Sequence, residues 1–576
     1  MPVITERKNM DFLEKYNEWL AYDKLDDEIK LELMAIGEDE QEIRERFLSD
    51  LKFGTGGLRG ILGAGTDRMN IYTVRRATQG LALYVKEQGG EERGVVIAYD
   101  SRFYSPEFAR TAARVLAGNG IRVYLFTELR PTPELSFAVR HLGCEVGIVI
   151  TASHNPAKYN GYKVYGPDGG QVANEAADYI FEKMQSTPIF GDIPESEMDS
   201  PLIRMINEEV DQPYYDAVLS QMIHKDLGNT ASEMKIVYTP FHGAGAVPVK
   251  EVLRRGGFHK VYVVPEQEAP DGAFPTVKSP NPEDKEGFAL AIELANKMEA
   301  DLIIGTDPDS DRVGVLAREM DGSFVALTGN MTGVLLTEYI LSQKTGLGLL
   351  PENPYVVKTV VTSEMIRCVT DHYGVELIDV LTGFKYIADT IHDHEEAGDM
   401  NFVFGFEESY GYLVGDYARD KDGVSACLLI AEMAAWYQSR GMTLCDVMRE
   451  LYAKYGIHKE WTKNVYFEGT DGIEKIKSIM ERLRSDIPET IGWSRVVAYT
   501  DYSVGVRHDV LSGSETKVNL PSSNVLRFEL EDKSWVAFRP SGTEPKFKIY
   551  AGVTRGNLEA KIDAIAESVN ALFAKE

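Results

Sequence analysis

Short apolar runs recur along the middle of the chain, and each run ends in a polar loop. The first such runs cover residues 95–99, 121–126 and 146–150. Continuous apolar stretches of this length are typical of strands buried on both faces. Between the first two runs, Ser105-Pro-Glu107 predicts a helix with Ser as N-cap and Pro in its first turn, ending at Gly118. This alternation predicts a mostly parallel sheet in an α/β domain.

The alternation restarts twice further along the chain. A second unit begins at Lys235 and includes apolar runs at 261–264 and 301–305; a third begins near Asn330 and includes runs at 355–361 and 402–406 and a buried helix at 422–440. We find no sequence repeat among the three units. What recurs is an apolar strand with a polar loop at its carboxyl end, where ligands bind in open α/β sheets.

The two ends of the chain follow other patterns. Residues 1–50 are charged and helical, and Phe12, Tyr16, Trp19 and Leu20 recur at helical spacing, which predicts an extension packed on the first domain. After residue 459, strands are expected at 464–467, 525–530, 535–538 and 547–551, with helices at 473–483 and at the end. This order predicts an α+β domain.

Length and charge limit the choice of function. A chain of 576 residues needs several cores, about three to five by ordinary domain size. With 61 basic and 90 acidic residues, the net charge of −29 disfavours nucleic acid and anionic membranes as partners. A phosphate-bearing ligand therefore needs a local basic pocket or a metal. The four widely spaced cysteines predict reduced thiols. Without an apolar run of the ~18 residues that span a bilayer, we expect a cytoplasmic protein.

Three carboxylates, Asp307, Asp309 and Asp311, alternate directly after a buried strand. Oxygen ligands at this spacing favour a hard cation, Mg²⁺ or Ca²⁺. An EF-hand is excluded, because Arg312 stands at its glycine position and Arg318 at its final glutamate position. The alternative is a solvated acidic turn, which the buried strand feeding this loop disfavours.

The run at 146–150 delivers Thr151-Ala-Ser-His-Asn-Pro156 to the edge of the sheet. Ser153 is a candidate acceptor of a phosphoryl group. Its neighbour His154 is a base, a phosphate ligand or a structural residue that fixes the loop. Lys163 is a proton shuttle, if a cation-rich site lowers its pKa, or an ordinary surface lysine. Upstream, residues 53–60 form a glycine-dense loop that carries Arg59 but lacks the Gly-Lys-Ser/Thr of a P-loop.

Two later loops also carry polar groups. Glu407-Glu-Ser409 either acts as an acid and base pair or accepts hydrogen bonds from sugar hydroxyls, and we favour the second. Arg539-Pro-Ser-Gly-Thr-Glu-Pro-Lys546 supplies a guanidinium, hydroxyls and free N–H groups that suit a phosphate monoester; the alternative is a generic surface loop. Together the loops indicate phosphoryl transfer.

The four motifs, Thr-Ala-Ser-His-Asn-Pro, Asp-Pro-Asp-Ser-Asp-Arg, Gly-Phe-Glu-Glu-Ser and Arg-Pro-Ser-Gly-Thr-Glu-Pro, resemble the signature loops of the α-D-phosphohexomutases, in the family's order. The length and the Phe-Gly-Thr-Gly-Gly-Leu-Arg-Gly loop are most similar to the phosphoglucomutase-2-type branch. The resemblance covers about residues 50–576. It implies three related α/β mixed-sheet domains and a C-terminal α+β domain of TATA-binding-protein-like fold around a central cleft. We expect boundaries at 1–205, 206–325, 326–458 and 459–576.

The resemblance also implies an α-phosphoglucomutase that works through a phosphoserine and glucose 1,6-bisphosphate. It assigns Ser153 as the phosphate carrier, Lys163 as general acid/base, and Arg59 and His154 as supporting residues. The Mg²⁺ ligands would be Ser153, Asp307, Asp309 and Asp311. The substrate contacts would be Arg312, Thr382, Gly383, Lys385, Glu407, Ser409, Arg419, Lys421, Arg539, Ser541, Gly542 and Thr543, with Lys546 a further candidate. We expect a monomer or weak homodimer with a small phosphosugar as its partner.

One departure concerns specificity. After Ser409 the chain reads Tyr410-Gly-Tyr412, where the phosphoglucomutase/phosphomannomutase branch carries Gly-His. A phosphomannomutase, a phosphopentomutase and a sugar phosphatase therefore remain alternatives. A bisphosphate synthase also remains open, whereas an inactive member is disfavoured because Ser153, the three aspartates and Lys163 are all present.

Overall fold

The computed structural model describes residues 11–52, 54, 56–467, 472–540, 546–554 and 556–573. The chain divides into two compact units. Unit 1 comprises Met1–Val315 with Leu413–Glu432, and unit 2 comprises Leu316–Tyr412 with Met433–Glu576. Among the described residues, no helix combines the length and apolar character needed to cross a membrane.

The first sheet of unit 1 has the strand order β1-β5-β4-β2-β3-β6. Its strands are β1 (Gly57–Ile61), β2 (Val95–Tyr99), β3 (Val123–Phe126), β4 (Val146–Ile150), β5 (Tyr159–Tyr165) and β6 (Ile203–Ile206). Its helices are α4 (Ile71–Glu87), α5 (Ser105–Gly118), α6 (Thr132–Leu142) and α7 (Asn174–Ser186). The predicted bounds of β2, α5 and β4 are confirmed. The prediction of Ser105 as N-cap is wrong: the N-cap is Tyr104, and the Ser105 hydroxyl donates to Asp100 Oδ1. The sheet is mixed, because β5 runs antiparallel to both β4 and β1.

The second sheet has the order β11-β10-β9-β7-β8 and the third has the order β13-β12-β14-β15. The second contains β7 (Lys235–Thr239), β8 (Lys260–Val263), β9 (Leu302–Thr306), β10 (Val313–Arg318) and β11 (Phe324–Leu327). The third contains β12 (Pro354–Thr359), β13 (Glu376–Val380), β14 (Asn401–Glu407) and β15 (Gly411–Val414). β7 runs parallel to both of its neighbours, β8 and β9, and β12 runs parallel to both of its neighbours, β13 and β14.

The three sheets share one strand order. In each, a first strand lies between the second and the third, and the fourth lies beyond the third, as in β3-β2-β4-β5, β8-β7-β9-β10 and β13-β12-β14-β15. The repeat that the sequence does not reveal is therefore present in the topology. The three polar loops predicted to carry chemistry all connect the third strand to the fourth.

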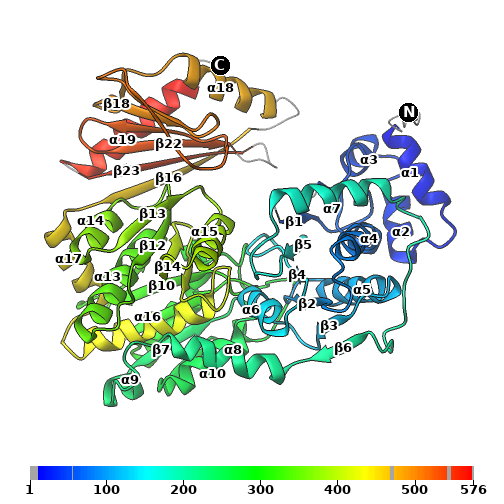
Figure 1. The fold of residues 1–576 in the computed structure, drawn as a ribbon, viewed down its shortest axis with the longest axis horizontal. Coiled ribbons are helices and arrows are strands. Elements are labelled where there is room, and N and C mark those ends of the chain that lie inside the picture. Colours follow the sequence, from blue (N-terminus) through cyan, green and yellow to red (C-terminus); the bar gives the residue numbers. More distant parts are fainter. Residues whose placement is uncertain are drawn as a thin grey trace. The chain divides into compact units, whose positions relative to one another are not determined.

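Helices cover these sheets and form the N-terminal extension. Those that accompany the second and third sheets are α8 (Glu208–Ser220), α9 (Asn229–Glu233), α10 (Ala246–Arg255), α11 (Pro265–Glu268), η1 (Lys285–Phe288), α12 (Ala289–Met298), α13 (Gly329–Leu347), α14 (Met365–Tyr373), α15 (Phe384–Ala397), α16 (Gly423–Gln438) and α17 (Leu444–Tyr455). The extension forms α1 (Phe12–Ala21), α2 (Asp27–Ala35) and α3 (Glu40–Phe47), which lie together in Figure 1. Trp19 is fully buried there, with its ring 5.7 Å from Phe47, 5.5 Å from Tyr72 and 5.3 Å from Phe190.

The C-terminal part of unit 2 is an antiparallel sheet of order β16-β23-β22-β21-β18-β19-β20, with β17 on β18. Its strands are β16 (Lys459–Tyr466), β17 (Thr490–Ile491), β18 (Ser494–Asp501), β19 (Val506–Asp509), β20 (Glu515–Lys517), β21 (Leu526–Leu530), β22 (Trp535–Pro540) and β23 (Lys546–Val553). Its helices are α18 (Gly472–Ser485) and α19 (Leu558–Phe573). The predicted fold class, three α/β mixed-sheet domains followed by an α+β domain, is confirmed.

A cluster of charges joins this antiparallel sheet to the third sheet. Glu364 lies 3.0 Å from Arg527, 3.3 Å from the buried Lys358 and 3.4 Å from Arg367. Burial disfavours the charged form of Glu364, but these three cations hold its pKa at about 2. Ionised Glu364 therefore stabilises unit 2.

Candidate active site

Ser153 lies in the loop that follows β4, in a backbone conformation that residues other than glycine rarely adopt. Its φ is 52°, and only 4% of the residue is exposed. Its hydroxyl donates to Asp307 Oδ2 at 3.0 Å, and His154 Nδ1 lies 3.4 Å from Ser153 Oγ. Since the β4–β5 loop and the β9–β10 loop come from different sheets of unit 1, the fold brings together two motifs that the sequence separates by 154 residues.

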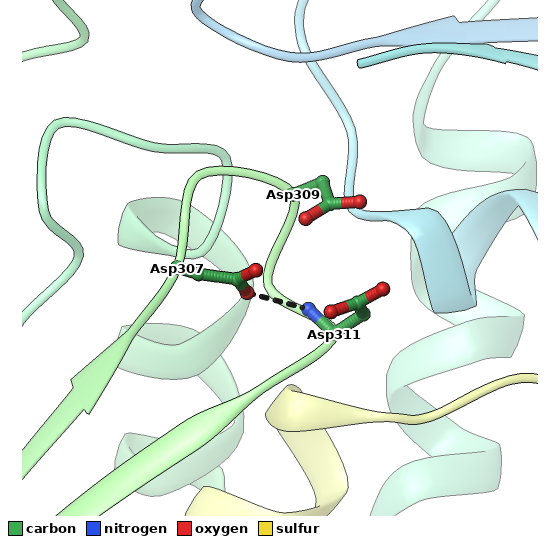
Figure 2. A group of neighbouring side chains, drawn as sticks. All are labelled: Asp307, Asp309 and Asp311. Atoms are coloured by element: carbon green, nitrogen blue, oxygen red, sulfur yellow. Dashed lines mark hydrogen bonds between the residues drawn. The ribbon is translucent and has the colours of Figure 1, made fainter. Parts of the chain in front are cut away.

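The three predicted metal ligands lie on one loop. Figure 2 shows Asp307 where β9 ends and Asp311 just before β10 begins, with Asp309 between them. Asp307 and Asp309 are fully buried, Asp311 is 1% exposed, and one ligand atom of each lies within 4.8 Å of the others. Asp307 Oδ1 accepts the backbone N–H groups of Asp311 at 3.1 Å and Arg312 at 3.0 Å, which fixes the turn.

Two carboxylate oxygens at this loop, Asp309 Oδ1 and Asp311 Oδ1, are buried and have no hydrogen-bond partner among the described residues. Burial and the like charges of Asp311 and Asp309 raise the pKa of Asp307 well above its ordinary value. Asp311 is shifted the other way: burial opposes ionisation, but Lys421, Lys163 and Arg312 together lower its pKa. A set of hard oxygen ligands, two of whose buried oxygens lack a hydrogen-bond partner among the described residues, fits a divalent cation such as Mg²⁺.

The other oxygens of the triad are held by the protein itself. Lys163 Nζ, on β5, lies 2.8 Å from Asp309 Oδ2 and 3.4 Å from Asp311 Oδ2. Lys421 Nζ lies 3.2 Å from Asp311 Oδ2 and 2.8 Å from Asp420 Oδ1. Lys163 is 8% exposed, so it is not an ordinary surface lysine.

The sequence-based expectation for the pKa of Lys163 was wrong in direction for the structure as described. Burial opposes the charged amine, but the adjacent Asp309 and Asp311 carboxylates outweigh burial, and the pKa is raised. The expectation counted only cations around the site, whereas the nearest charges to Lys163 are carboxylates.

The remaining predicted residues of unit 1 differ in their surroundings. Arg59 is exposed on β1, and its backbone lies opposite Gly161 of β5. Arg312 lies 2.9 Å from Glu283. Arg419 is 1% exposed, and its guanidinium donates to the carbonyls of Asp416 and Ala418, which are structural contacts within its own loop. The substrate roles of Arg312 and Arg419 stay predictions.

Unit 2 brings together the predicted sugar-binding segments. Gly383 N–H donates to Glu407 Oε1 at 3.0 Å, which joins the segment Thr382–Lys385 to the loop that carries Ser409. Thr382 and Glu407 are buried, at 9% and 7% exposure. Lys385 lies in the first turn of α15, where burial lowers its pKa.

The phosphate-binding motif is described only in part. Arg539 lies near the end of β22, and its charge lowers the pKa of Tyr550 against a larger upward effect of burial. Lys546 begins β23. Ser541, Gly542 and Thr543 lie outside the described residues.

The sequence reasoning missed three residues that hold this site. Thr132, at the start of α6, donates its hydroxyl to Asp309 Oδ2 at 2.8 Å and its N–H to Asp309 O at 2.9 Å. Asp100 and Arg102, directly after β2, bond to the Ser153 loop. Their position in the sequence could have identified them, because each follows the carboxyl end of a predicted strand.

Comparisons with known proteins agree with this geometry. Residues 50–188, 212–322 and 328–455 match Phosphoglucomutase/phosphomannomutase, alpha/beta/alpha domains I, II and III, respectively. The chain is 38% identical over 534 residues to a phosphoglucomutase of Staphylococcus aureus, covering 92% of this chain and 94% of that protein. The chain belongs to the phosphoglucomutase/phosphomannomutase family. The membership predicted from the four motifs is confirmed.

Other members of the family extend the comparison over the whole length. A Staphylococcus epidermidis phosphoglucomutase is 36% identical over 560 residues, covering 96% of this chain and 98% of that one. The solved structure of a phosphoglucomutase/phosphomannomutase family protein from Burkholderia thailandensis has a TM-score of 0.65 at 19% identity, covering 90% and 96% of the two chains. Paramecium parafusin, a phosphoglucomutase, gives 0.66 at 17%, covering 92% and 96%. These two structures show that the fold is shared.

Proposed function

We propose that the protein is an α-phosphoglucomutase that interconverts glucose 1-phosphate and glucose 6-phosphate through phosphorylated Ser153. The observation that carries this proposal is the 3.0 Å hydrogen bond from the Ser153 hydroxyl to Asp307, inside a buried triad that also holds Lys163. Family membership and the phosphoglucomutase names of relatives at 36–38% identity support the same activity.

Each turnover consists of two phosphoryl transfers. In the first, the free sugar hydroxyl attacks the phosphorus of phospho-Ser153, the bond from phosphorus to Ser153 Oγ breaks, and glucose 1,6-bisphosphate forms. In the second, Ser153 Oγ attacks the other phosphate and the product is released. In both, one proton moves from the attacking oxygen to the leaving oxygen. We assign this proton to Lys163, with His154 and Arg59 in supporting roles.

We assign Asp307, Asp309, Asp311 and an oxygen on Ser153 as ligands of one Mg²⁺ ion. The hard oxygen donors and the two unpartnered carboxylate oxygens support this choice. When bound, the ion would neutralise charge on the transferring phosphoryl group. The chain supplies the rest: it excludes water by burying the triad and directs the Ser153 hydroxyl toward it.

We assign substrate binding to both units. In unit 1 the residues are Arg312, Arg419 and Lys421. In unit 2, the sugar hydroxyls would be bound by Glu407 and Ser409, with support from Thr382, Gly383 and Lys385. A phosphate would be held by Arg539, Ser541, Gly542 and Thr543. The bond between Gly383 and Glu407 supports joint action of the first two segments.

We also retain four domains at 1–205, 206–325, 326–458 and 459–576. Each family match lies inside one of the first three. A cytoplasmic location and a monomeric or weakly dimeric state stay predictions.

The deciding experiment measures glucose 6-phosphate formed from glucose 1-phosphate, with Mg²⁺ and trace glucose 1,6-bisphosphate. Wild type, Ser153→Ala and the control Ser220→Ala are compared; Ser220 is exposed and bonds only its own helix among the contacts described for it. We expect Ser153→Ala to lose turnover and labelling by radioactive bisphosphate, whereas Ser220→Ala keeps both.

Three results would contradict the proposal. Stoichiometric release of inorganic phosphate would identify a phosphatase. Mannose 1-phosphate or ribose 1-phosphate turning over as fast as glucose 1-phosphate would refute the choice of sugar. Full activity of Ser153→Ala would remove the phosphoserine mechanism.

A further inference from the structure

One buried arginine, Arg102, bonds several backbone carbonyls in and next to the loop that carries Ser153. It lies just after β2 and is 1% exposed. One terminal nitrogen donates to the carbonyls of Pro156 and Tyr159, both at 3.0 Å, and the other donates to those of Ser153 and Asn155. A single side chain therefore satisfies four carbonyl oxygens, three in the loop and one at Tyr159, the first residue of β5.

These bonds answer a specific need of the loop. The chain reverses direction within a few residues, and Ser153 has the positive φ that only glycine adopts readily. A regular ladder does not supply donors to the carbonyls of such a turn, so the buried carbonyl of Ser153 needs a donor from elsewhere in the chain. The carbonyl of His154, which Arg102 does not bond, accepts instead from the Ser279 hydroxyl at 2.8 Å.

Arg102 is itself held in place. Its N–H donates to Asp100 Oδ1 at 3.0 Å, and its Nε lies 3.3 Å from Asp100 Oδ2. Asp100 is fully buried and its Oδ2 accepts the hydroxyl of Thr151 at 2.6 Å; that hydroxyl in turn accepts the N–H of Ser153 at 2.8 Å. Asp100 thus reaches Ser153 from both sides, through Thr151 at its N–H and through Arg102 at its carbonyl.

The guanidinium carbon of Arg102 lies 5.0 Å from the centre of the Phe274 ring, which belongs to the segment after α11. This cation–π contact links the Ser153 loop to the part of unit 1 that also supplies the aspartate triad. The position of Ser153 relative to Asp307 therefore depends on Arg102 as well as on the loop's own sequence.

We propose that Arg102, anchored by Asp100, is a positioning residue that sets the backbone of Ser153 and thereby aims its oxygen at the aspartate triad. Arg102 touches no substrate; it acts through the loop. The planar guanidinium has two terminal nitrogens that together donate to four carbonyls. Lysine keeps the positive charge but has one nitrogen, so Arg102→Lys separates the loss of hydrogen-bond geometry from the loss of charge. The inference rests on the proposed phosphoserine function.

The test compares Arg102→Lys with Arg76→Lys. Arg76 is a matched control, because it is also buried, at 7% exposure, and also bonds three carbonyls (those of Met184, Gln185 and Thr187) and an aspartate, Asp50. The readouts are the melting temperature, kcat and KM for glucose 1-phosphate, and the single-turnover rate at which Ser153 takes up phosphate from labelled glucose 1,6-bisphosphate.

We expect Arg102→Lys to lower kcat and the uptake rate by about 100-fold, because misplacement of a reacting group by ~1 Å has that effect, with KM changed less than about threefold. Arg76→Lys should lower the melting temperature and leave kcat and uptake within about twofold. Equal behaviour of the two variants, or a rise in KM at unchanged kcat, would overturn the positioning role.

Two further measurements keep the test decisive. If Arg102→Lys does not fold, Asp100→Asn removes the anchoring charge at constant volume and leaves the four carbonyl bonds in place; we expect kcat and uptake to fall about tenfold, and unchanged uptake would overturn the inference. If wild type itself takes up no phosphate, the proposed function fails, whereas equal uptake by wild type and both variants refutes the positioning role alone.

Discussion

The contact between Thr132 and Asp309 gives a sharp test of the metal site. Thr132 is fully buried, and its hydroxyl donates to Asp309 Oδ2 at 2.8 Å. Lys163 bonds the same oxygen, which leaves Asp309 Oδ1 buried and without a hydrogen-bond partner in the described structure. We therefore expect Thr132 to orient the carboxylate so that Oδ1 is available to the cation.

The substitution Thr132→Val removes the hydroxyl at nearly constant volume and retains the backbone bond to Asp309 O. A hydrogen bond to a charged group contributes about 1.5–3 kcal/mol. Since 1.4 kcal/mol is about tenfold in an equilibrium constant, full coupling to ion binding predicts a loss of metal affinity of about 10- to 100-fold. Turnover at saturating Mg²⁺ should change far less, because the three ligands remain.

Two assays measure this loss independently. One is the Mg²⁺ concentration that half-activates glucose 1-phosphate turnover. The other is direct Mn²⁺ binding, followed by the electron paramagnetic resonance signal of free Mn²⁺, which needs no activity. Thr132→Ser, which restores the hydroxyl, should recover most of the affinity. Thr337→Val is the control, because Thr337 is equally buried but bonds the carbonyl of Gly333 in its own helix.

The reasoning is refuted if Thr132→Val binds Mn²⁺ as tightly as wild type. It is also refuted if the serine variant loses as much affinity as the valine variant, because the effect would then come from packing. A loss of kcat at saturating metal with unchanged Mn²⁺ affinity would assign Thr132 to a step after ion binding.

Three further predictions concern stability and proton transfer. Glu364→Gln should destabilise unit 2 by about 3 kcal/mol at pH 7, measured by urea unfolding. Because the pKa of Glu364 lies at about 2, below its ordinary 4.5, the stability difference from wild type should persist above pH 4.5 and shrink as the pH falls toward 2. A stability difference that stays constant over this pH range would refute the ionic origin. Trp19→Ala should cost about 3–5 kcal/mol in thermal unfolding, whereas Trp493→Ala, at a site 70% exposed, should stay within about 0.5 kcal/mol; equal effects would contradict the packing argument. Lys163→Met should lower kcat by about 10²- to 10⁴-fold, measured beside the exposed-lysine control Lys158→Met, and a loss under tenfold would exclude Lys163 as the proton carrier.

The sequence predicted the fold best where strands are buried on both faces. β2 and β4 are continuous apolar runs, because helices cover both sides of the sheet, and their bounds were predicted to the residue. The strand β5 was not predicted from the sequence. Its range, Tyr159–Tyr165, includes Asn160, Gly161 and Lys163, a composition that is typical of a polar loop. These polar groups are buried because Asn160 bonds Phe103 O and Ser105, and Lys163 bonds the triad.

The candidate site was predicted at the level of motifs. Ser153 and the three aspartates were predicted because each motif combines a buried strand with a distinctive polar loop, and the fold brings them together. The direction of the Lys163 pKa shift was predicted wrongly, because it depends on which charges lie nearest in space. Thr132 and Arg102 carry no distinctive local pattern; their roles arise from contacts with Asp309 and with the Ser153 loop that only the folded chain creates.

The shared strand order explains where supporting residues such as Arg102 occur, whereas Thr132 follows β3 and contacts a loop of the second sheet. In each sheet the first strand lies beside the third, so the loop after the first strand lies against the loop after the third. In the first sheet Arg102 bonds the carbonyl of Ser153. In the second, Ala244 N–H donates to Pro308 O of the aspartate loop at 2.7 Å.

The third sheet shows the same arrangement: the Thr359 hydroxyl donates to Glu408 Oε2 at 3.0 Å. One topological rule therefore pairs each chemistry-bearing loop with the carboxyl end of the neighbouring strand, either its last residue (Thr359) or the loop that follows it. These supporting segments use three different kinds of contact: an arginine side chain, a backbone amide and a hydroxyl. They therefore need no sequence motif in common. Substitutions in them should change the geometry of the reacting loop without touching the substrate.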